Sequence, residues 1–180
     1  MQINVAQLLK QPVGATRQYE LQEQLEPIDT DVLPVAPLEG TVHLLRTGRG
    51  VLVHLQGRTQ VQIACSRCLE PYTTPVEINF QEEFFPTIDI HTGLPIAAPE
   101  EDKAAIIDGN HVLDLGEMVR QYLLLSLPMH PLCRQDCAGL CPNCGHNLNE
   151  GPCACPPEPV DSRWATLREL LHETPGGGRP

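Results

Sequence analysis

Alternating apolar and polar positions dominate the first half of the chain and predict β-strands. In residues 58–64, Val61 and Ile63 alternate with glutamines, which is typical of a strand with one buried and one solvent-facing side. A Thr-Gly-Arg-Gly run and a single glycine separate neighbouring strand patterns and are typical of tight turns. The pattern therefore predicts an antiparallel meander. Its three strands are expected at residues 39–46, 51–56 and 58–64, with turns at residues 47–50 and at Gly57, and further strands are expected at residues 17–25 and 72–85.

Helical periodicity appears in the second half of the chain. Residues 115–127 carry a broad apolar face, with Asp114 at the expected N-cap and Glu117 at the capping-box position. A second, shorter helix is expected at residues 162–172, where Asp161 is the expected N-cap.

These elements predict an α+β fold: mainly an antiparallel β-sheet, one long helix, and a C-terminal Cys-rich zinc-binding module with a short terminal helix. Residues 3–10 fit either a short helix or an opening strand, and a short strand near residues 105–113 is expected to return to the sheet. The predicted regions are residues 1–127 for the sheet core and long helix, 128–157 for the zinc module, and 158–180 for the short helix and a disordered tail.

Composition narrows the classes of function. Only 4% of the 180 residues are aromatic, which disfavours nucleic-acid binding by stacking of bases on several rings. No apolar stretch long enough to span a bilayer is present and the N-terminus lacks a secretory pattern, so we expect a cytoplasmic location and no membrane partner. The residues form no P-loop, Ser-His-Asp ordering or Gly-rich dinucleotide motif, so they point to none of those enzyme classes.

Charge is unevenly distributed along the chain. The net charge is −11, yet residues 40–69 carry +4 and leave −15 for the remainder. Arginines on adjacent antiparallel strands could form one basic patch and contact phosphate groups. The alternative is that they balance nearby carboxylates such as Glu70 and Glu77. The four arginines are Arg46, Arg49, Arg58 and Arg67.

Six of the eight cysteines crowd into residues 133–155. Cys141 and Cys144 form a C-x-x-C-G motif, in which two thiolates bind one metal and the following glycine permits the positive φ of a zinc knuckle. Because the segment has few core-forming residues, we expect structural Zn²⁺ to supply its folding energy. The spacing leaves open which four ligands bind, with His130 and His146 as further candidates. The six cysteines are Cys133, Cys137, Cys141, Cys144, Cys153 and Cys155.

Cys65 and Cys68 form a separate C-x-x-C pair at the end of a predicted strand, and three interpretations stay open. The pair supplies two ligands to a second Cys₄ site together with the two leftover thiols, or acts as a redox dithiol, or is a tight structural or partner-binding turn. No βαβ pattern surrounds the pair, which disfavours a thioredoxin-like protein. The cofactor prediction is therefore one or two Zn²⁺ ions.

Five stretches carry a further signal. They are INVAQLLKQPVGATRQYEL from residue 3, CSRCLEPY from residue 65, DLGEMVRQYLLLSLP from residue 114, LCRQDCAGLCPNCGHNLN from residue 132 and DSRWATLRELL from residue 161. In this order, over residues 1 to 172, the chain resembles the bacterial YceD-type large ribosomal RNA accumulation proteins, formerly a domain of unknown function.

The resemblance implies a non-enzymatic factor, with no small-molecule substrate, for synthesis, processing or accumulation of large-subunit ribosomal RNA and for assembly of the large ribosomal subunit. Two partners of opposite charge are expected: the RNA on the basic segment, or a basic large-subunit ribosomal protein on the acidic remainder. Two alternative functions stay open, namely a thiol-redox protein that uses Cys65 and Cys68, and a zinc-ribbon module that docks on another protein without touching RNA.

Overall fold

The computed structural model describes residues 1–96, 105–156 and 162–164. It divides into two compact units, Met1–Cys137 (unit 1) and Ala138–Pro180 (unit 2). Most of the helix expected at residues 162–172, with its N-cap Asp161, lies outside the described residues, where only the 3₁₀ turn η2 (Ser162–Trp164) is seen. No helix in the described part is both long enough and apolar enough to cross a membrane.

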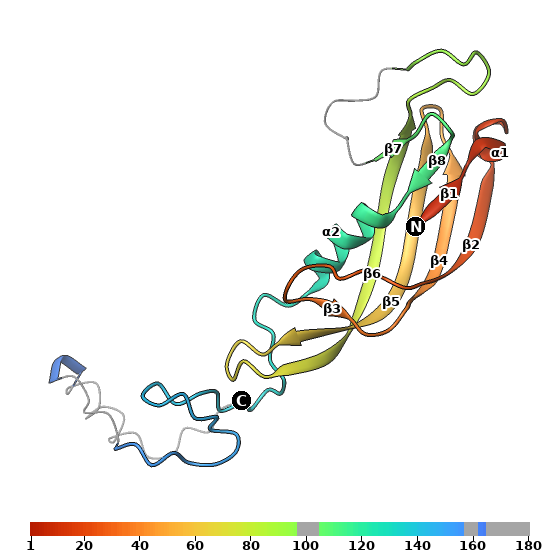
Figure 1. The fold of residues 1–180 in the computed structure, drawn as a ribbon. Coiled ribbons are helices and arrows are strands. Elements are labelled where there is room, and N and C mark those ends of the chain that lie inside the picture. The colour runs from red at the N-terminus through yellow and green to blue at the C-terminus, as the bar shows by residue number, and fades with distance from the viewer. Residues whose placement is uncertain (97–104, 157–161, 165–180) are drawn as a thin grey trace, which may run out of the picture. The chain divides into compact units, whose positions relative to one another are not determined.

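Unit 1 is built on one eight-stranded sheet, with the strands in the order β1-β8-β7-β6-β5-β4-β2 and β3 paired to β5. The β6–β7 pair is parallel and the other pairs are antiparallel, so the sheet is mixed. The three longest strands lie side by side (Figure 1). The strands are β1 (Gln2–Asn4), β2 (Thr16–Glu23), β3 (Leu33–Pro34), β4 (Leu38–Arg46), β5 (Val51–Ala64), β6 (Pro71–Pro86), β7 (Ile106–Ile107) and β8 (Val112–Asp114).

Strands β4 and β5 pair antiparallel as expected, but the two strands expected at residues 51–56 and 58–64 are one continuous strand, β5, of 14 residues. The turn expected at Gly57 is therefore wrong, because Gly57 pairs with Gly40 of β4 and with Ile78 of β6. A Cβ atom at Gly57 would lie 2.9 Å from Leu38 Cδ1. The glycine thus makes room for a packed leucine inside the sheet and does not end a strand.

The inner face of the sheet carries the core. Val61 and Ile63 are buried while Gln60 is exposed, which confirms the alternation expected for this strand. Helix α2 (Gly116–Ser126) lies next to β6 and covers this face with Met118, Val119 and Leu123 (Figure 1). The core of unit 1 is therefore apolar and continuous from β4 to α2.

Helix α2 begins just after the expected start. The Asp114 carboxylate accepts a hydrogen bond from the Gly116 N–H at 2.8 Å, so it still satisfies a free amide of the first turn. The Glu117 carboxylate accepts from Arg120 and Gln121 in the following turn. At the other end, Leu127 is already extended and Pro128 follows it, which ends the helix.

Short strands form the edge of the sheet opposite β2. The opening residues form both expected alternatives in succession, β1 and then helix α1 (Ala6–Leu9). The single strand expected at residues 105–113 is instead two strands, β7 and β8, around a turn in which the His111 N–H donates to the Asp108 carbonyl at 3.0 Å. This turn places β8 between β7 and β1, so β1 is the last strand at this edge of the sheet.

Unit 2 has almost no buried side chains in its described residues. Only Gly139 and Cys141 are buried there. The chain is held by turn hydrogen bonds, such as that from the Leu148 N–H to the Gly139 carbonyl at 2.8 Å. Because so little apolar surface is buried, hydrophobic packing contributes little to the stability of this unit.

Candidate metal centres

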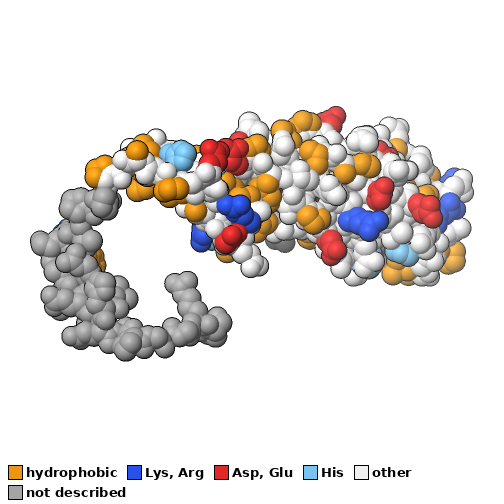
Figure 2. Space-filling view, turned by 90° about the horizontal axis from the view of Figure 1, so that it is seen from below, with side chains coloured by type: hydrophobic (Ala, Val, Ile, Leu, Met, Phe, Trp, Pro, Cys, Tyr) orange, Lys and Arg blue, Asp and Glu red, His pale blue; other side chains and the backbone are white. Residues whose placement is uncertain are grey.

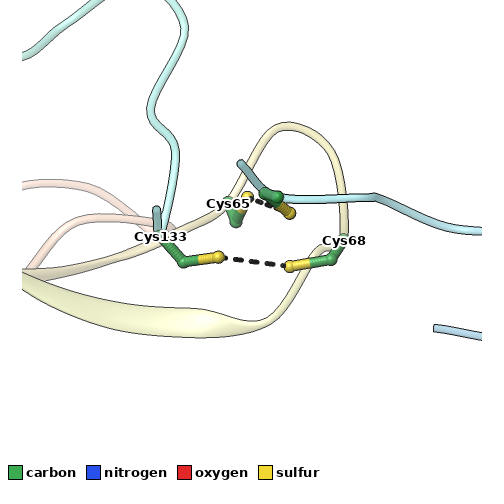
Figure 3. Close-up of side chains that lie close together, drawn as sticks. Cys65, Cys68 and Cys133 are labelled. Carbon is green, nitrogen blue, oxygen red and sulfur yellow. Dashed lines mark hydrogen bonds between the residues drawn. The ribbon is translucent and has the colours of Figure 1, made fainter. Parts of the chain in front are cut away.

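The first four-cysteine group lies at one end of the sheet in unit 1. Cys65 and Cys68 come from the β5–β6 turn, and Cys133 and Cys137 come from the segment after α2. The four sulfur atoms all lie within 4.8 Å of one another. The Sγ atoms of Cys65 and Cys137 are 3.8 Å apart, and those of Cys68 and Cys133 are 3.7 Å apart (Figure 3). We call these residues the clamp group.

The sulfur spacing of the clamp group suits a tetrahedral metal site. Four sulfurs at about 2.3 Å from one ion would be separated by about 3.8 Å. A disulfide would need about 2.05 Å, and all eight cysteines are free thiols. Three of the four side chains are buried and Cys133 is half-buried, so the group is enclosed by protein.

The second group lies entirely in unit 2 and consists of Cys141, Cys144, Cys153 and Cys155. These sulfurs also lie within 4.8 Å of one another, and the Sγ atoms of Cys141 and Cys153 are 3.4 Å apart. Cys141 is buried, Cys144 is exposed, and the other two are half-buried. We call these residues the local group, because all four come from one short stretch of chain.

Both groups are built on the same backbone turn. In the clamp group the Cys65 N–H donates to the Glu70 carbonyl and the Leu69 N–H donates to the Cys65 carbonyl, both at 2.9 Å. In the local group the Cys141 N–H donates to the His146 carbonyl at 2.8 Å and the Gly145 N–H to the Cys141 carbonyl at 2.9 Å. The same two hydrogen bonds therefore shape both C-x-x-C turns.

The residue after the second cysteine has a positive φ in both turns. Gly145 has φ 73°, as expected for the glycine of a zinc knuckle. Leu69 occupies the equivalent position with φ 61°, although a side chain is disfavoured there. The sequence signal for this second knuckle was the repeated C-x-x-C motif. Leu69, in place of the glycine, concealed that the two motifs form the same turn.

Backbone contacts hold the two segments of the clamp group together. The Ser66 N–H donates to the Pro131 carbonyl at 2.8 Å, and Arg67 Nη1 donates to the Cys137 carbonyl at 2.9 Å. These bonds fix residues 131–137 against the β5–β6 turn and so bring the four thiols together.

Ionisation of the clamp thiols is uneven. Burial raises the pKa of Cys65, but N–H groups of Cys133 and of the turn stabilise its thiolate and lower its pKa to about 6. Burial, and then the neighbouring Cys137 thiol, raise the pKa of Cys133 to about 12. One thiolate therefore forms readily and further ionisation is opposed, a situation that a bound divalent cation would relieve.

The local group shows the same contrast. N–H groups of Cys144 and Asn143 lower the pKa of Cys141 to about 6. The neighbouring Cys144 thiol, and then burial, raise the pKa of Cys155 to about 12. In both groups the pKa of the first cysteine of the knuckle is lowered.

The structure thus arranges the eight cysteines as two sets of four. This is the arrangement in which Cys65 and Cys68 join the two thiols left over from the C-terminal cluster. His130 and His146 belong to neither set. Spacing alone did not reveal the arrangement, because Cys133 and Cys137 are close in sequence to the local group and distant from Cys65.

Two of the predicted partner-binding arginines lie at the β4–β5 turn. Arg46 Nη1 donates to two backbone carbonyls of its own turn, at 2.7 and 2.8 Å. Arg49 forms an ion pair with Glu83 at 2.6 Å, and its guanidinium lies 5.3 Å from the centre of the Phe85 ring. Both guanidinium groups are therefore engaged by nearby protein atoms.

The other two arginines lie further along β5. Arg58 pairs in register with Glu39 and Glu77, and its guanidinium is 3.8 Å from the Glu39 carboxylate. Arg67 lies in the β5–β6 turn, at the far end of β5 from Arg46. The 14 residues of β5 span about 45 Å, so the four arginines do not form one patch. On the face drawn in Figure 2, basic side chains lie next to acidic ones and form no separate basic area.

Comparison with known proteins identifies relatives for most of the chain. A family model described as large ribosomal RNA subunit accumulation protein YceD matches residues 53–171, which include all eight cysteines. An uncharacterised protein of Mycobacterium tuberculosis is 27% identical over 175 residues, covering 95% of this chain and 81% of that protein. A chloroplastic YCED homolog 1 of Zea mays, named a large ribosomal RNA subunit accumulation protein, is 28% identical over 156 residues, covering 73% of this chain and 53% of the maize protein.

No solved structure matches the chain. The matched stretch runs from β5 through the clamp group and the local group, so it spans the features that the geometry singles out. Because the family model covers more than half of the chain, the protein belongs to the YceD family of large ribosomal RNA subunit accumulation proteins.

Proposed function

We propose that this protein is a non-enzymatic, cytoplasmic assembly factor for the large ribosomal subunit, and that the clamp group and the local group each hold a structural Zn²⁺ ion. Membership of the YceD family carries the assembly role, since the family is described by the accumulation of large-subunit ribosomal RNA. The reducing cytoplasm would keep the eight thiols available as metal ligands.

The geometry of the sulfurs supports zinc at both groups. Four thiolates without carboxylate or imidazole ligands favour Zn²⁺ over Mg²⁺ or Ca²⁺, and four protein ligands leave no open position for a catalytic water. In the clamp group each turn sulfur has its close contact with a sulfur of the other segment. This cross-pairing favours a four-ligand site over a redox dithiol made of Cys65 and Cys68 alone.

Depletion of the protein tests the assembly role. We expect the amount of large-subunit ribosomal RNA to fall relative to small-subunit RNA, and the unaltered gene to restore it. A gene that carries Cys65→Ser and Cys68→Ser tests whether the clamp group is needed. Normal large-subunit RNA in depleted cells would contradict the assembly role.

Metal content tests the two sites independently of any cellular role. We expect native mass spectrometry to show two zinc ions on the intact chain and one on each variant that lacks one pair of knuckle cysteines. A chain purified under reducing conditions with zinc supplied, but carrying no metal, would contradict the proposal for both groups.

A protein-docking role without RNA contact is the second candidate, and the dispersed arginines favour it. Each of the four guanidinium groups already faces a carboxylate or a backbone carbonyl. Crosslinking in cells, followed by nuclease treatment, distinguishes the two candidates. Protein partners that survive nuclease favour docking on protein, and loss of every partner favours direct RNA binding.

A further inference from the structure

The outer face of the sheet in unit 1 is hollowed around Arg58. A hollow of about 690 Å³ crosses four strands and reaches β2, β4, β5 and β6. A second hollow of about 470 Å³ adjoins it and extends toward Pro75 of β6. The two hollows share Glu39, Arg58 and Glu77, so they form one continuous depression, which we call the outer groove.

Carboxylates outnumber cations in the outer groove. Glu39, Arg58 and Glu77 face one another in a single cross-strand row, and Glu20 lies in the neighbouring row. Arg58 is the only basic residue among those that line the two hollows. The Arg58 side chain is 79% exposed, and its guanidinium lies 3.8 Å from the Glu39 carboxylate, which is beyond hydrogen-bond distance. Arg58 therefore neutralises this carboxylate only weakly and leaves the groove acidic.

The larger hollow also reaches an open sheet edge. Strand β2, which contributes Glu20 and Gln22 to the lining, stands last in the strand order. Within the described residues β4 is its only strand partner, so the backbone groups on its other side face no strand. Such an edge can form backbone hydrogen bonds with an added extended segment, which neither a free cation nor a folded duplex can do.

We propose that the outer groove binds an extended polypeptide segment rich in lysine and arginine. The cationic side chains of this segment form ion pairs with Glu20, Glu39 and Glu77, and the extended backbone of the segment runs near the β2 edge. A phosphate backbone would meet three carboxylates for one guanidinium, so the same groove repels RNA. The inference deepens the proposed function, on which it rests, because it assigns the chemical class of the factor's partner.

Binding of a short synthetic peptide to the purified full-length, zinc-loaded protein tests the proposal. The probe is a fluorescent peptide of alternating lysine and serine, with an alternating glutamate and serine peptide and a single-stranded RNA of uridines in parallel. We expect only the lysine peptide to bind, and its binding to weaken as salt rises. Replacing both Glu39 and Glu77 with lysine should weaken it about tenfold.

Two matched variants make the result specific to the outer groove. The double change Glu26→Lys and Asp31→Lys alters net charge equally, at exposed positions outside both hollows, and should leave binding within about twofold. The change Arg58→Gln should tighten binding about threefold, an outcome that misfolding cannot imitate.

Three results would overturn the proposal. The Glu39 and Glu77 variant could bind the lysine peptide as tightly as the unaltered protein, or the Glu26 and Asp31 variant could lose as much binding as the Glu39 and Glu77 variant. The third result is that the protein binds the RNA and does not bind the lysine peptide. These readouts use purified protein, so they are separate from RNA accumulation in cells. If the peptide fails to bind while depletion still lowers large-subunit RNA, the groove assignment fails and the proposed function stands.

Discussion

The clamp group joins cysteines that are 65 and 72 residues apart in the sequence, whereas Cys141 and Cys153 of the local group are only 12 residues apart. The same knuckle therefore serves two different structural tasks. In unit 1 it ties a turn of a well-packed sheet to the segment that follows α2. In unit 2 it organises a stretch that has almost no buried residues of its own.

The difference shows where a metal contributes most to folding. Unit 1 has a continuous apolar core from α1 to α2, so the sheet can persist when its clamp opens. Unit 2 has only Gly139 and Cys141 buried in its described residues, so little holds its fold once the thiols lose their ion. Loss of metal should therefore be local in unit 1 and complete in unit 2.

The largest effect is expected from disabling the local group. With Cys141→Ser and Cys144→Ser, we expect residues 138–156 to unfold even when zinc is supplied, because thiolate ligation replaces the missing core. Hydrogen exchange measures this directly, through loss of protection at the Gly145 and Leu148 amides. Amides of β5 serve as the internal control and should stay protected. Continued protection of Leu148 would show that turn hydrogen bonds alone hold this unit.

Disabling the clamp group should cost less and should be confined to unit 1. With Cys65→Ser and Cys68→Ser, we expect the free energy of unfolding of unit 1 to fall by about 4 kcal/mol, the chain entropy of a cross-link closing a loop of 72 residues. Chemical denaturation monitored by β-sheet circular dichroism measures this change. A variant as stable as the unaltered protein would show that the clamp contributes no stability.

Removal of metal by a chelator should distinguish the two groups by rate. Cys144 is exposed, whereas Cys65, Cys68 and Cys137 are buried, so a chelator reaches the local group more easily. We expect zinc to leave in two phases that differ about tenfold in rate, equivalent to about 1.4 kcal/mol in barrier height. A variant that lacks the knuckle cysteines of one group should show only the phase that belongs to the other group. A single common rate in the intact chain would remove the distinction.

Much of the fold could be predicted from the sequence, because strand alternation is a local property. The buried Val61 and Ile63 were recognisable from their period of two. Gly57 was misread, because a glycine required by the packing of Leu38 looks the same in sequence as one required by a turn. The two residues of β3 were missed, since a strand that short has no detectable period.

The candidate site was less predictable, because its assembly depends on distant contacts. The knuckle at Cys141 was evident from its glycine, yet the assignment of Cys133 and Cys137 required the chain to return to the β5–β6 turn after α2. The four arginines were close in sequence, but only Arg58 lies within β5, while Arg46 and Arg49 lie before its start and Arg67 lies beyond its end. Proximity in sequence was misleading in both cases, because an extended strand separates residues that a helix or a turn would gather.

The smallest expected effect compares the two knuckles residue by residue. Leu69 is 65% exposed and has φ 61°, so it buries little surface while its backbone occupies a region that disfavours side chains. We expect Leu69→Gly to raise the free energy of unfolding of unit 1 by about 0.5 kcal/mol, because relief of strain exceeds the added flexibility of the unfolded chain. The reverse change Gly145→Leu, at a position where an added Cβ atom would have no other atom within 4 Å, should destabilise unit 2 by a similar amount.

A second exposed leucine supplies the control for this exchange. Leu94 is 64% exposed but does not have a positive φ, so Leu94→Gly adds flexibility to the unfolded chain without relieving strain and should be neutral or destabilising. Denaturation midpoints of the two glycine variants, measured side by side with zinc bound, check the difference in sign. If Leu69→Gly instead destabilises unit 1 as much as Leu94→Gly or more, the Leu69 side chain contributes packing that offsets its strain, and the two knuckles are not energetically equivalent at this position.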